Sequence, residues 1–298
     1  MSYTIVVFVK QVPDTQNITG QAMKPDGTVN RAALPAIFNP EDLNALELAL
    51  QLKDRYQAKV IVATMGPPNA SEVLRDALFR GADEAVLLTD RAFAGADTLA
   101  TSFALSCCAR RIGHYDLILC GRQAIDGDTA QVGPQLAEKL ALPQICYVQE
   151  VLEMTAKKIK ARREIDGGYE VLEAPLPALL TVVAANEPRP PRAGRIMKYK
   201  KARTPSELIK ARGKDNYADA NDLEMEKDAL RKRSLLIQEW TAADVNADPN
   251  RIGLKGSPTK VKNIESVVLS AADTKSIEAT EAGVTRLIQE LILDHTLG

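Results

Sequence analysis

The sequence is poor in the residues that metal sites and nucleic-acid surfaces require. Its 298 residues include two histidines, His114 and His295, and four cysteines, none of them in a C-x-x-C pair. These are too few ligands at usable spacing for a zinc or iron–sulfur site. Aromatic residues make up 4% and the formal net charge is −1, whereas nucleic-acid-binding proteins usually carry a basic excess and stacking aromatics. We therefore predict no metal site and no nucleic-acid partner.

We also expect no segment that directs the protein to another compartment or anchors it in a membrane. No stretch approaches the roughly 20 apolar residues that a membrane span needs. The first ten residues lack the charged, apolar and small-residue regions of a signal peptide. We expect a cytoplasmic protein without membrane insertion, whose cysteines stay reduced and pack as small apolar side chains. The cysteines are Cys107, Cys108, Cys120 and Cys146.

Three signatures of common active sites are missing from the sequence. It contains no G-x-G-x-x-G, no G-x-x-x-x-G-K-[ST] and no G-x-S-x-G. No histidine is placed to serve a serine or cysteine nucleophile. We accordingly assign no catalytic residue and look for binding residues instead.

The first 185 residues contain a regular alternation of strand and helix patterns. Short β-branched runs such as 4–9 and 59–65 are typical of strands buried on both faces. Stretches between them carry apolar residues at helical spacing, as in Leu43, Leu46 and Leu50. The predicted strands are 4–9, 59–65, 84–88 and 117–120, and the predicted helices are 40–54, 69–80, 97–111 and 129–140. This alternation predicts an α/β fold with a parallel, doubly wound, Rossmann-like sheet.

The pattern changes after the predicted helix 129–140. Three strand-like segments follow, and Asp166-Gly167-Gly168 is typical of a tight turn between two of them. We therefore predict a β-hairpin addition to the sheet, with strands at 147–154, 157–164 and 169–173, and one more strand at 178–184.

The last third of the chain is strongly charged and then amphipathic. Residues 189–214 carry ten Lys and Arg against one Glu, and residues 215–228 reverse the sign. Such runs are usually solvated, so we expect an extended or helical arm. Near the end, Val284, Leu287, Ile288, Leu291 and Ile292 form one apolar stripe at helical spacing.

The densest candidate site is the segment 120–134, C-G-R-Q-A-I-D-G-D-T-A-Q-V-G-P. It leads from a predicted strand into a predicted helix, and Gly121 allows close approach of the backbone to a ligand. Asp126, Gly127, Asp128 and Thr129 predict a turn with a helix cap, so that the amides of 129–132 open a helix and form a phosphate cradle. Arg122 adds a charged fork. Alone, the segment is more typical of an ordinary strand–turn–helix connection with a good cap than of a binding site.

Three further segments are predicted to reach the same edge of the sheet. Val9 and Lys10 leave the first strand, Asn39-Pro40-Glu41-Asp42 begins the first helix with Asn39 as its cap, and Thr64-Met65-Gly66 leaves the second strand. Each alone is typical of a routine turn. In doubly wound sheets, however, ligands bind beyond the carboxyl ends of the strands, so their convergence favours a nucleotide site.

These motifs, taken together, resemble those of electron-transfer flavoprotein beta subunits. The matching motifs occur in family order and cover residues 1 to about 200. They are V-K-Q-V-P-D-T at 9–15, N-P-E-D at 39–42, G-R-Q-A-I-D-G-D-T-A-Q-V-G-P at 121–134, R-E-I-D-G-G at 163–168 and N-E-P-R…I-M-K at 186–198. The candidate binding residues are Val9, Lys10, Asn39, Asp42, Thr64, Met65, Gly66, Asp97, Thr98, Gly121, Arg122, Gln123, Asp126, Gly127, Asp128, Thr129, Ala130, Gln131, Val132 and Gly133.

The resemblance implies a sheet of the adenine-nucleotide-binding type and a heterodimer with an alpha subunit that carries its own FAD. In respiratory members the beta subunit holds AMP, and in electron-bifurcating members it holds a second FAD beside which NAD(H) docks. The run G-L-K-G-S-P-T-K-V at 253–261 is similar to bifurcating and nitrogen-fixation-linked members. The partner-recognition loop of respiratory relatives carries an exposed leucine, and the matching position here is Ala193.

We therefore expect a nucleotide-binding domain at 1–188 and, at 189–298, a recognition loop, linker and arm contacting the alpha subunit. The expected function is electron transfer from NADH through an FAD in this chain to the alpha-subunit FAD and a flavin enzyme such as an acyl-CoA dehydrogenase or reductase. The alternative is an AMP-binding structural subunit of a simple carrier between acyl-CoA dehydrogenase and the respiratory chain. A stand-alone nucleotide-binding signalling module is a third possibility, although it would need no arm.

Overall fold

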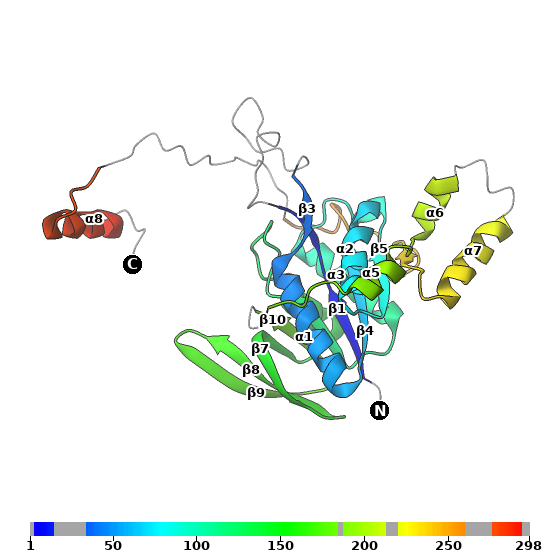
Figure 1. The fold of residues 1–298 in the computed structure, drawn as a ribbon, viewed down its shortest axis with the longest axis horizontal. Coiled ribbons are helices and arrows are strands. Elements are labelled where there is room, and N and C mark those ends of the chain that lie inside the picture. The colour runs from blue at the N-terminus through cyan, green and yellow to red at the C-terminus, as the bar shows by residue number, and fades with distance from the viewer. Residues whose placement is uncertain (1–2, 15–33, 184–186, 213–219, 260–275, 294–298) are drawn as a thin grey trace.

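The computed structural model describes residues 3–14, 34–183, 187–212, 220–259 and 276–293. Within them the chain builds a nine-stranded sheet in the order β11-β5-β4-β1-β6-β10-β7-β8-β9 (Figure 1). Its strands are β1 (Thr4–Phe8), β4 (Lys59–Met65), β5 (Glu84–Leu88), β6 (Leu117–Gly121), β7 (Gln144–Met154), β8 (Lys158–Ile165), β9 (Gly168–Pro175), β10 (Ala178–Val182) and β11 (Gln238–Trp240). A separate two-stranded sheet pairs β2 (Gln11–Pro13) with β3 (Ala36–Phe38).

The central strands run parallel and in register. β1 pairs on one side with β4 and on the other with β6, and β10 continues the parallel arrangement beyond β6. Their residues are β-branched or leucine-rich and buried on both faces, as a sheet covered by helices requires. The predicted doubly wound α/β fold is confirmed, and the carboxyl ends of β1, β4, β5 and β6 share one edge.

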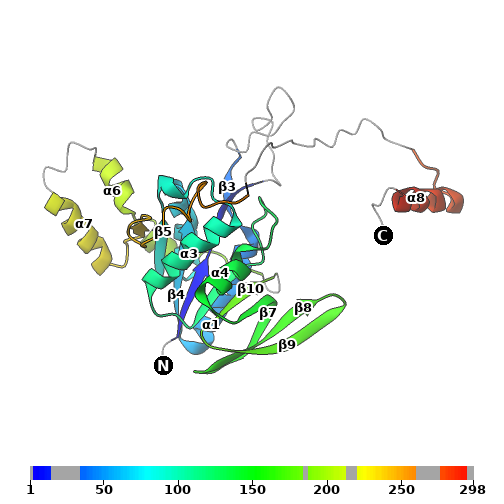
Figure 2. The same ribbon diagram turned by 180° about the vertical axis from the view of Figure 1, so that it is seen from behind.

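Helices cover both faces of this sheet. The helices α1 (Pro40–Tyr56) and α2 (Ser71–Arg80) pack on one face, and α3 (Thr98–Ile112) and α4 (Val132–Leu140) on the other (Figures 1 and 2). Each face has its own apolar core, which these helices share with the strands. The two cores fix the helix starts, and thus the loops before them, at the carboxyl edge.

Local sequence explains most helix ends. Pro40 occupies the first turn of α1, where its missing N–H costs nothing, and acidic residues follow it. The side chain of Asp97 caps α3 by accepting a hydrogen bond from the amide of Ala100 at 2.9 Å. Gly81 ends α2 at a φ of 147° that side chains rarely tolerate. The predicted helices in this half therefore form, with ends shifted by up to three residues.

The predicted hairpin is also present. β7, β8 and β9 form an antiparallel extension of the sheet, and Gly167 adopts a φ of 76° in the Asp166-Gly167 turn. β7 begins three residues before the predicted start at 147, because Gln144 and Ile145 already pair with β10. Tyr147, at a φ of 61°, marks the irregularity where the pairing with β10 shifts register.

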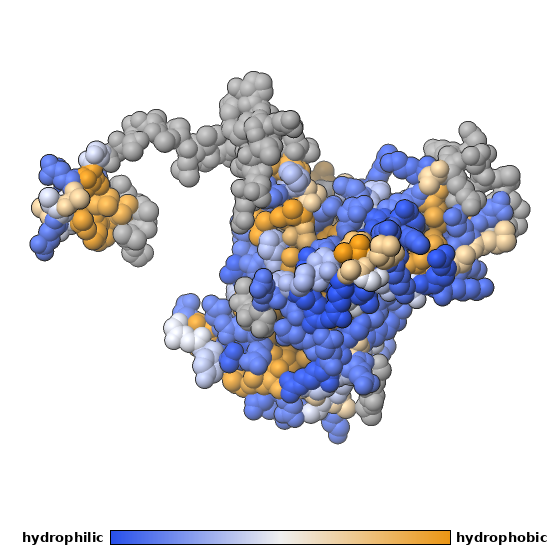
Figure 3. Space-filling model, viewed as in Figure 1, coloured by the Kyte–Doolittle hydropathy of each residue, from blue (hydrophilic) through white to orange (hydrophobic). Residues whose placement is uncertain are grey.

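The last third of the chain adds four helices and one strand in its described parts. They are α5 (Ala193–Tyr199), α6 (Pro205–Arg212), α7 (Ala220–Lys232), β11 and α8 (Glu281–Leu293). β11 lies against β5 as the edge strand of the main sheet. No residue of α8 is buried, and Figure 3 displays an apolar surface on this helix. No helix in the described ranges is long and apolar enough to cross a membrane.

Some sequence-based expectations fall outside the described residues. These are Thr15 of the first motif, Asn186 of N-E-P-R, Lys260 and Val261 of the glycine-rich run, and His295. The four cysteines all lie inside and are free, with Cys107, Cys108 and Cys120 buried.

Candidate functional site

The candidate residues gather where the sheet changes winding direction. From β1 the chain crosses α1 to β4 and β5 on one side, then returns through α3 to β6 on the other side. The carboxyl ends of β1 and β6 are therefore the topological switch point at which doubly wound sheets bind ligands. Val9 and Lys10 follow β1, Thr64 and Met65 end β4, and Gly121 ends β6.

Asp42 joins the two central strand ends. Its carboxylate accepts hydrogen bonds from the amide of Lys10 at 2.8 Å and from the amide of Gly121 at 3.1 Å. A Cβ on Gly121 would lie only 2.5 Å from Asp42 Oδ1 and 2.7 Å from the backbone nitrogen of Asp42. The start of α1 can therefore pack this closely against the end of β6 only because residue 121 is glycine.

Burial gives Asp42 unusual electrostatics. The side chain is 7% exposed, and burial raises the pKa of Asp42 to about 7, against the lowering effect of hydrogen bonds from Asn39, Lys10 and Gly121. Burial likewise raises the pKa of the neighbouring Cys120 thiol far above its ordinary value. Cys120 therefore stays a neutral core residue, as predicted, while Asp42 titrates near neutrality.

Asn39 and Glu41 continue the contact between α1 and the loop after β6. The Asn39 amide nitrogen donates to the carbonyl of Gln123 at 2.8 Å, and its oxygen accepts the amide of Ile125 at 3.2 Å. Asn39 occupies the cap position as predicted, but its side chain makes no cap bond because this loop engages it. Arg122 Nη2 donates to Glu41 Oε1 at 2.8 Å.

A surface ion pair closes the same loop over β1. Lys10 Nζ lies 2.7 Å from Asp126 Oδ1 and 2.8 Å from Oδ2. Gln123 Nε2 donates to Asp128 Oδ1 at 2.9 Å. The structure thus brings Lys10, Asn39, Asp42, Gly121, Arg122, Gln123, Asp126 and Asp128 into one connected cluster.

The predicted phosphate cradle has a different backbone from the one expected. α4 begins at Val132 with Gln131 as its cap, three residues later than predicted, and no side chain caps it. The reason is that Asp128 and Ala130 adopt φ values of 46° and 51°, which a helix excludes. Asp128 and Thr129 are therefore not helix caps.

The backbone that replaces the expected helical turn still suits an anion. Where left-handed residues alternate with residues of another backbone conformation, successive N–H groups can point into the same concave surface. Such a surface binds anions. The amides of Val132 and Gly133 then follow in the first turn of α4, where they have no partner within the helix. Gly133 packs tightly, since a Cβ there would lie 2.6 Å from Thr181 Cγ2.

A second cluster adjoins the first through α3. Thr98 Oγ1 donates to Gln131 Oε1 at 2.9 Å, which ties the start of α3 to the start of α4. The Asp97 amide donates to Ser257 Oγ at 2.8 Å, and Asp97 Oδ2 accepts the amide of Thr259 at 3.1 Å. Burial raises the pKa of Asp97, but hydrogen bonds from Ala100 and Thr259 outweigh it, so the pKa lies below the ordinary value.

The glycine-rich run at 253–259 therefore lies beside the candidate site. Gly253 needs to be glycine, because a Cβ would stand 2.1 Å from the carbonyl oxygen of Ala92. Ser257, which is 4% exposed, also donates to the carbonyl of Gly253 at 2.7 Å. Sequence reasoning named neither Glu41 nor Ser257 as a site residue, although each stands inside a motif that it had singled out.

Two buried side-chain polar atoms in the described chain have no hydrogen-bond partner, and both belong to candidate residues. They are Thr64 Oγ1 and Arg122 Nε. Buried polar groups are normally paired, and an unpaired one costs about 1–3 kcal/mol. Two such atoms at one sheet edge fit a polar ligand that supplies the missing acceptors or donors. By contrast, Met65 packs against an apolar core and the Gly66 amide donates to the carbonyl of Leu88.

A second feature lies on the α1–α2 face, where arginine side chains attach residues 187–207 to these two helices. Arg189 makes a two-pronged contact with Glu47 at 2.9 and 3.0 Å and also reaches Asp54 at 2.8 Å. Arg195 donates to the carbonyls of Leu78 and Ala82 at the end of α2. Ala193 and Met197 stay exposed on α5.

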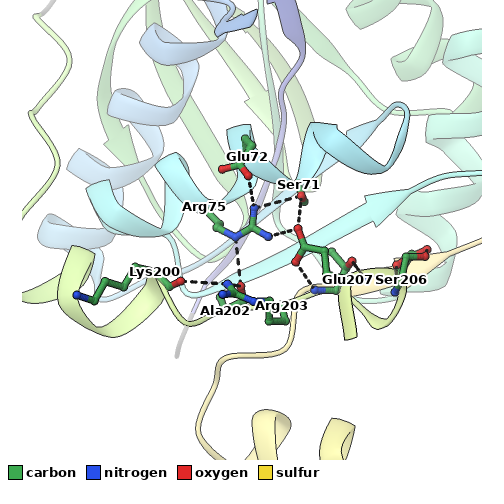
Figure 4. Close-up of polar contacts among 10 residues, drawn as sticks. Ser71, Glu72, Arg75, Lys200, Ala202, Arg203, Ser206 and Glu207 are labelled. Carbon is green, nitrogen blue, oxygen red and sulfur yellow. Dashed lines mark hydrogen bonds and ion pairs between the residues drawn. The ribbon is translucent and has the colours of Figure 1, made fainter. Parts of the chain in front are cut away.

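Arg75 fixes the end of this segment, as Figure 4 shows. It is 6% exposed and donates to Glu207, to Ser71 and to the carbonyl of Ala202. A hydrogen bond and the charge of Arg75 hold the pKa of Glu207 below its ordinary value although burial raises it. A hollow of about 430 Å³ lies beside Arg75 and Glu207. It lies on the α2 side and holds none of the candidate binding residues; its lining is Glu72, Arg75, Phe79, Lys200, Arg203 and Glu207.

Comparison with known proteins identifies this combination of fold and motifs. Residues 26–206 match the family model described as the electron transfer flavoprotein domain. The chain is 46% identical to the electron transfer flavoprotein subunit beta of Clostridium acetobutylicum over 259 residues, which are 87% of this chain and 86% of the relative. It is therefore an α/β protein of the electron transfer flavoprotein family, and it belongs there among the beta subunits.

Two further relatives extend the comparison. The chain is 43% identical to the caffeyl-CoA reductase-Etf complex subunit CarD of Acetobacterium woodii over 259 residues, 86% of this chain and 85% of the relative. It is 39% identical to protein FixA of Bradyrhizobium diazoefficiens over 297 residues, 97% of this chain and 91% of the relative. Membership of this family implies a role in electron transfer, in which beta subunits work with an alpha subunit and redox partners.

Proposed function

We propose that this beta subunit binds FAD at the carboxyl edge of its sheet, takes electrons from NADH there and passes them to the FAD of its alpha subunit. The alpha-subunit FAD would then reduce an acceptor flavin enzyme, and the complex would carry out electron bifurcation. The observation that carries the nucleotide site is the pair of unpartnered buried atoms, Thr64 Oγ1 and Arg122 Nε, at the switch point.

The residues of the site would divide the work of holding the nucleotide. The amides around Thr129 to Gly133 would receive the phosphates, which suits the left-handed backbone at Asp128 and Ala130. The ends of β1 and β4 would hold the adenine, with Thr64 at the end of β4, where it pairs with Leu87 of β5. FAD would supply the redox chemistry, accepting electrons in pairs and releasing them singly. Arg122 would place a positive charge near the ring system.

We prefer FAD to AMP for two reasons. The loop at Gly127 leaves space for a ligand longer than AMP, and the names of several relatives favour a bifurcating complex. A Cβ added to Gly127 would meet nothing within 4 Å. One relative is named as a subunit of a caffeyl-CoA reductase complex and others as FixA. The 253–259 run, similar to bifurcating members, packs directly beside Asp97. The alternative remains an AMP-binding structural subunit of a simple electron carrier.

The absorbance spectrum of the purified heterodimer separates these two functions. We expect two FAD per heterodimer and bleaching of one flavin by NADH without any acyl-CoA. One FAD plus one AMP after gentle purification, with no bleaching, would establish the alternative. An Arg122→Gln variant keeps a polar side chain but shortens it and removes its charge, so NADH should bleach each bound flavin more slowly.

The partner of this subunit is proposed to cover α8. Val284, Ile288 and Ile292 are 50%, 45% and 51% exposed, so the apolar stripe predicted from the sequence is unburied in this chain. Exposed apolar surface of this kind marks an interaction site. Deletion of residues 270–298 should leave the sheet domain folded but abolish stable association with the alpha subunit. Stoichiometric co-purification of the truncated chain would refute this assignment.

A further inference from the structure

We infer, on the basis of the proposed nucleotide site, that Asn39 and Asp42 are positioning residues. They hold the loop after β6 in the shape that receives the nucleotide and do not contact the nucleotide themselves. This assigns a different role to two residues that the sequence placed among the ligand contacts. The inference rests on which polar atoms at this edge are already bonded within the chain.

Both side chains are fully used by the protein. Asn39 is 0% exposed, and the two ends of its amide group are bonded to the backbone at Gln123 and Ile125. Asp42 is 7% exposed, and each of its two oxygens accepts one backbone amide, from Lys10 and from Gly121. Neither side chain has a polar atom turned to an open site.

The partners of both residues are backbone groups of the same loop. Gly121, Gln123 and Ile125 lie 79 to 86 residues from the start of α1 in the sequence, so these bonds attach the loop to a different layer of the fold. Within that layer α1 is anchored by its core residues, among them Leu46 and Leu50 at 1% exposure. The rigid start of α1 thus sets the backbone that leads into Asp126 and Asp128.

Thr64 and Arg122 differ from Asn39 and Asp42 in this respect. Thr64 is 1% exposed and its hydroxyl has no partner, and Arg122 Nε is buried and unpaired. Such atoms are available to a ligand. Residues that contact the nucleotide and residues that position the loop should therefore differ in their effects on binding kinetics. Loss of a ligand contact speeds dissociation, whereas loss of positioning lowers the fraction of competent loop and so slows association.

The test uses the heterodimer stripped of nucleotide, with FAD and AMP as probes in separate runs. In Asn39→Asp a carboxylate oxygen faces the carbonyl of Gln123, and in Asp42→Asn an amide N–H faces a backbone N–H. We expect association to slow about tenfold in each variant, with dissociation changed less than twofold. In Thr64→Val we expect dissociation to quicken about fivefold, the effect of one hydrogen bond, with association unchanged.

Amide hydrogen exchange of the stripped protein supplies a readout that does not depend on bound nucleotide. Residues 121–128 should exchange faster in Asn39→Asp and Asp42→Asn but not in Thr64→Val. The matched control is Asp116→Asn. Asp116 accepts the amide of Thr4 at 2.7 Å and so anchors the opposite end of β1. The Asp116→Asn substitution should leave nucleotide association, nucleotide dissociation and the amide exchange of residues 121–128 unchanged.

The outcomes separate this inference from the function on which it rests. Uptake of FAD or AMP by the unaltered protein, with faster dissociation and normal loop exchange in Asn39→Asp and Asp42→Asn, would make both residues ligand contacts and overturn the positioning role alone. No uptake of either nucleotide by the unaltered protein would overturn the nucleotide site together with the positioning role.

Discussion

Two connections of this molecule follow central strands and are tied to α1, yet they are built in opposite ways. The loop 121–131 after β6 binds the start of α1 through Asn39 and Asp42 but leaves Arg122 Nε unpaired. The segment 187–207 after β10 binds α1 through Arg189, the end of α2 through Arg195, and Arg75 of α2 through Ala202 and Glu207, with each guanidinium bonded to several acceptors.

On the proposed function, this difference separates a binding site from a scaffold. Buried polar groups that are all satisfied rigidify a structure, whereas unsatisfied ones cost free energy until a ligand pairs them. The hydrogen bonds of the arginine-fixed segment therefore hold its outer surface, on α5, in one geometry. The loop after β6 instead keeps a buried polar atom, Arg122 Nε, without a partner inside the chain, where a ligand could bond to it.

The largest effect is expected at Arg189. Removing its guanidinium in Arg189→Met leaves Glu47, 8% exposed, as an unpaired buried charge, so unfolding free energy should fall by about 3–5 kcal/mol. Urea unfolding measures this. The double variant Arg189→Met/Glu47→Leu should recover most of the loss, and a double variant as unstable as the single one would contradict the ion-pair explanation.

Asp42 should give the protein a pH-dependent stability. Because burial raises its pKa to about 7 in the folded state, its contribution is fully present below its unfolded pKa near 4 and is lost as the pH rises through 7. Asp42→Asn lacks this titration. We therefore expect the unaltered protein to lose unfolding free energy relative to Asp42→Asn as the pH rises to about 7.5, and the difference between them to stay constant above that pH. Urea unfolding from pH 4.5 to 8.5 measures this difference. A constant difference would show that Asp42 does not titrate there.

Glycine at 121 should matter where glycine at 127 does not. Gly121→Ala places a Cβ 2.5 Å from Asp42 Oδ1, which should cost about 1–3 kcal/mol of stability through overpacking and weaken nucleotide retention. Gly127→Ala meets nothing within 4 Å and serves as the matched control for the loss of a glycine. Equal effects of the two variants on melting temperature would contradict the close packing of α1 on β6.

The smallest effect is kinetic and concerns the outer surface of the arginine-fixed segment. If α5 docks the acceptor enzyme, electron transfer should slow as salt rises and slow further in Arg192→Glu, because exposed charges act over about 8 Å at physiological salt. Arg195 is unsuitable for this test, since it donates to two carbonyls of α2 and its loss would disturb the fold. Arg91→Glu, an exposed charge change on the opposite face, should leave the rate unaltered.

The sequence predicted the sheet because buried parallel strands and helix stripes are local patterns. It placed the start of α4 at residue 129 because Asp126-Gly127-Asp128-Thr129 has the composition of a helix cap, yet Asp128 and Ala130 are left-handed. A cap and a turn draw on the same residue types, so composition cannot separate them. The bonds from Asn39 to Gln123 and from Asp97 to Thr259 join residues 84 and 162 positions apart, and no local pattern encodes them.

The exposed helix α8 has a consequence for the production of this protein. In the part of the chain that the structure describes, none of the 13 residues of this helix is buried, so each unassembled copy carries its apolar surface into solution. Such surfaces promote self-association and capture by chaperones and proteases. Synthesis of this chain in excess of its alpha subunit should therefore yield aggregated or degraded material, whereas balanced co-synthesis should not. The ratio at which the two chains are made becomes part of the physical chemistry of the complex.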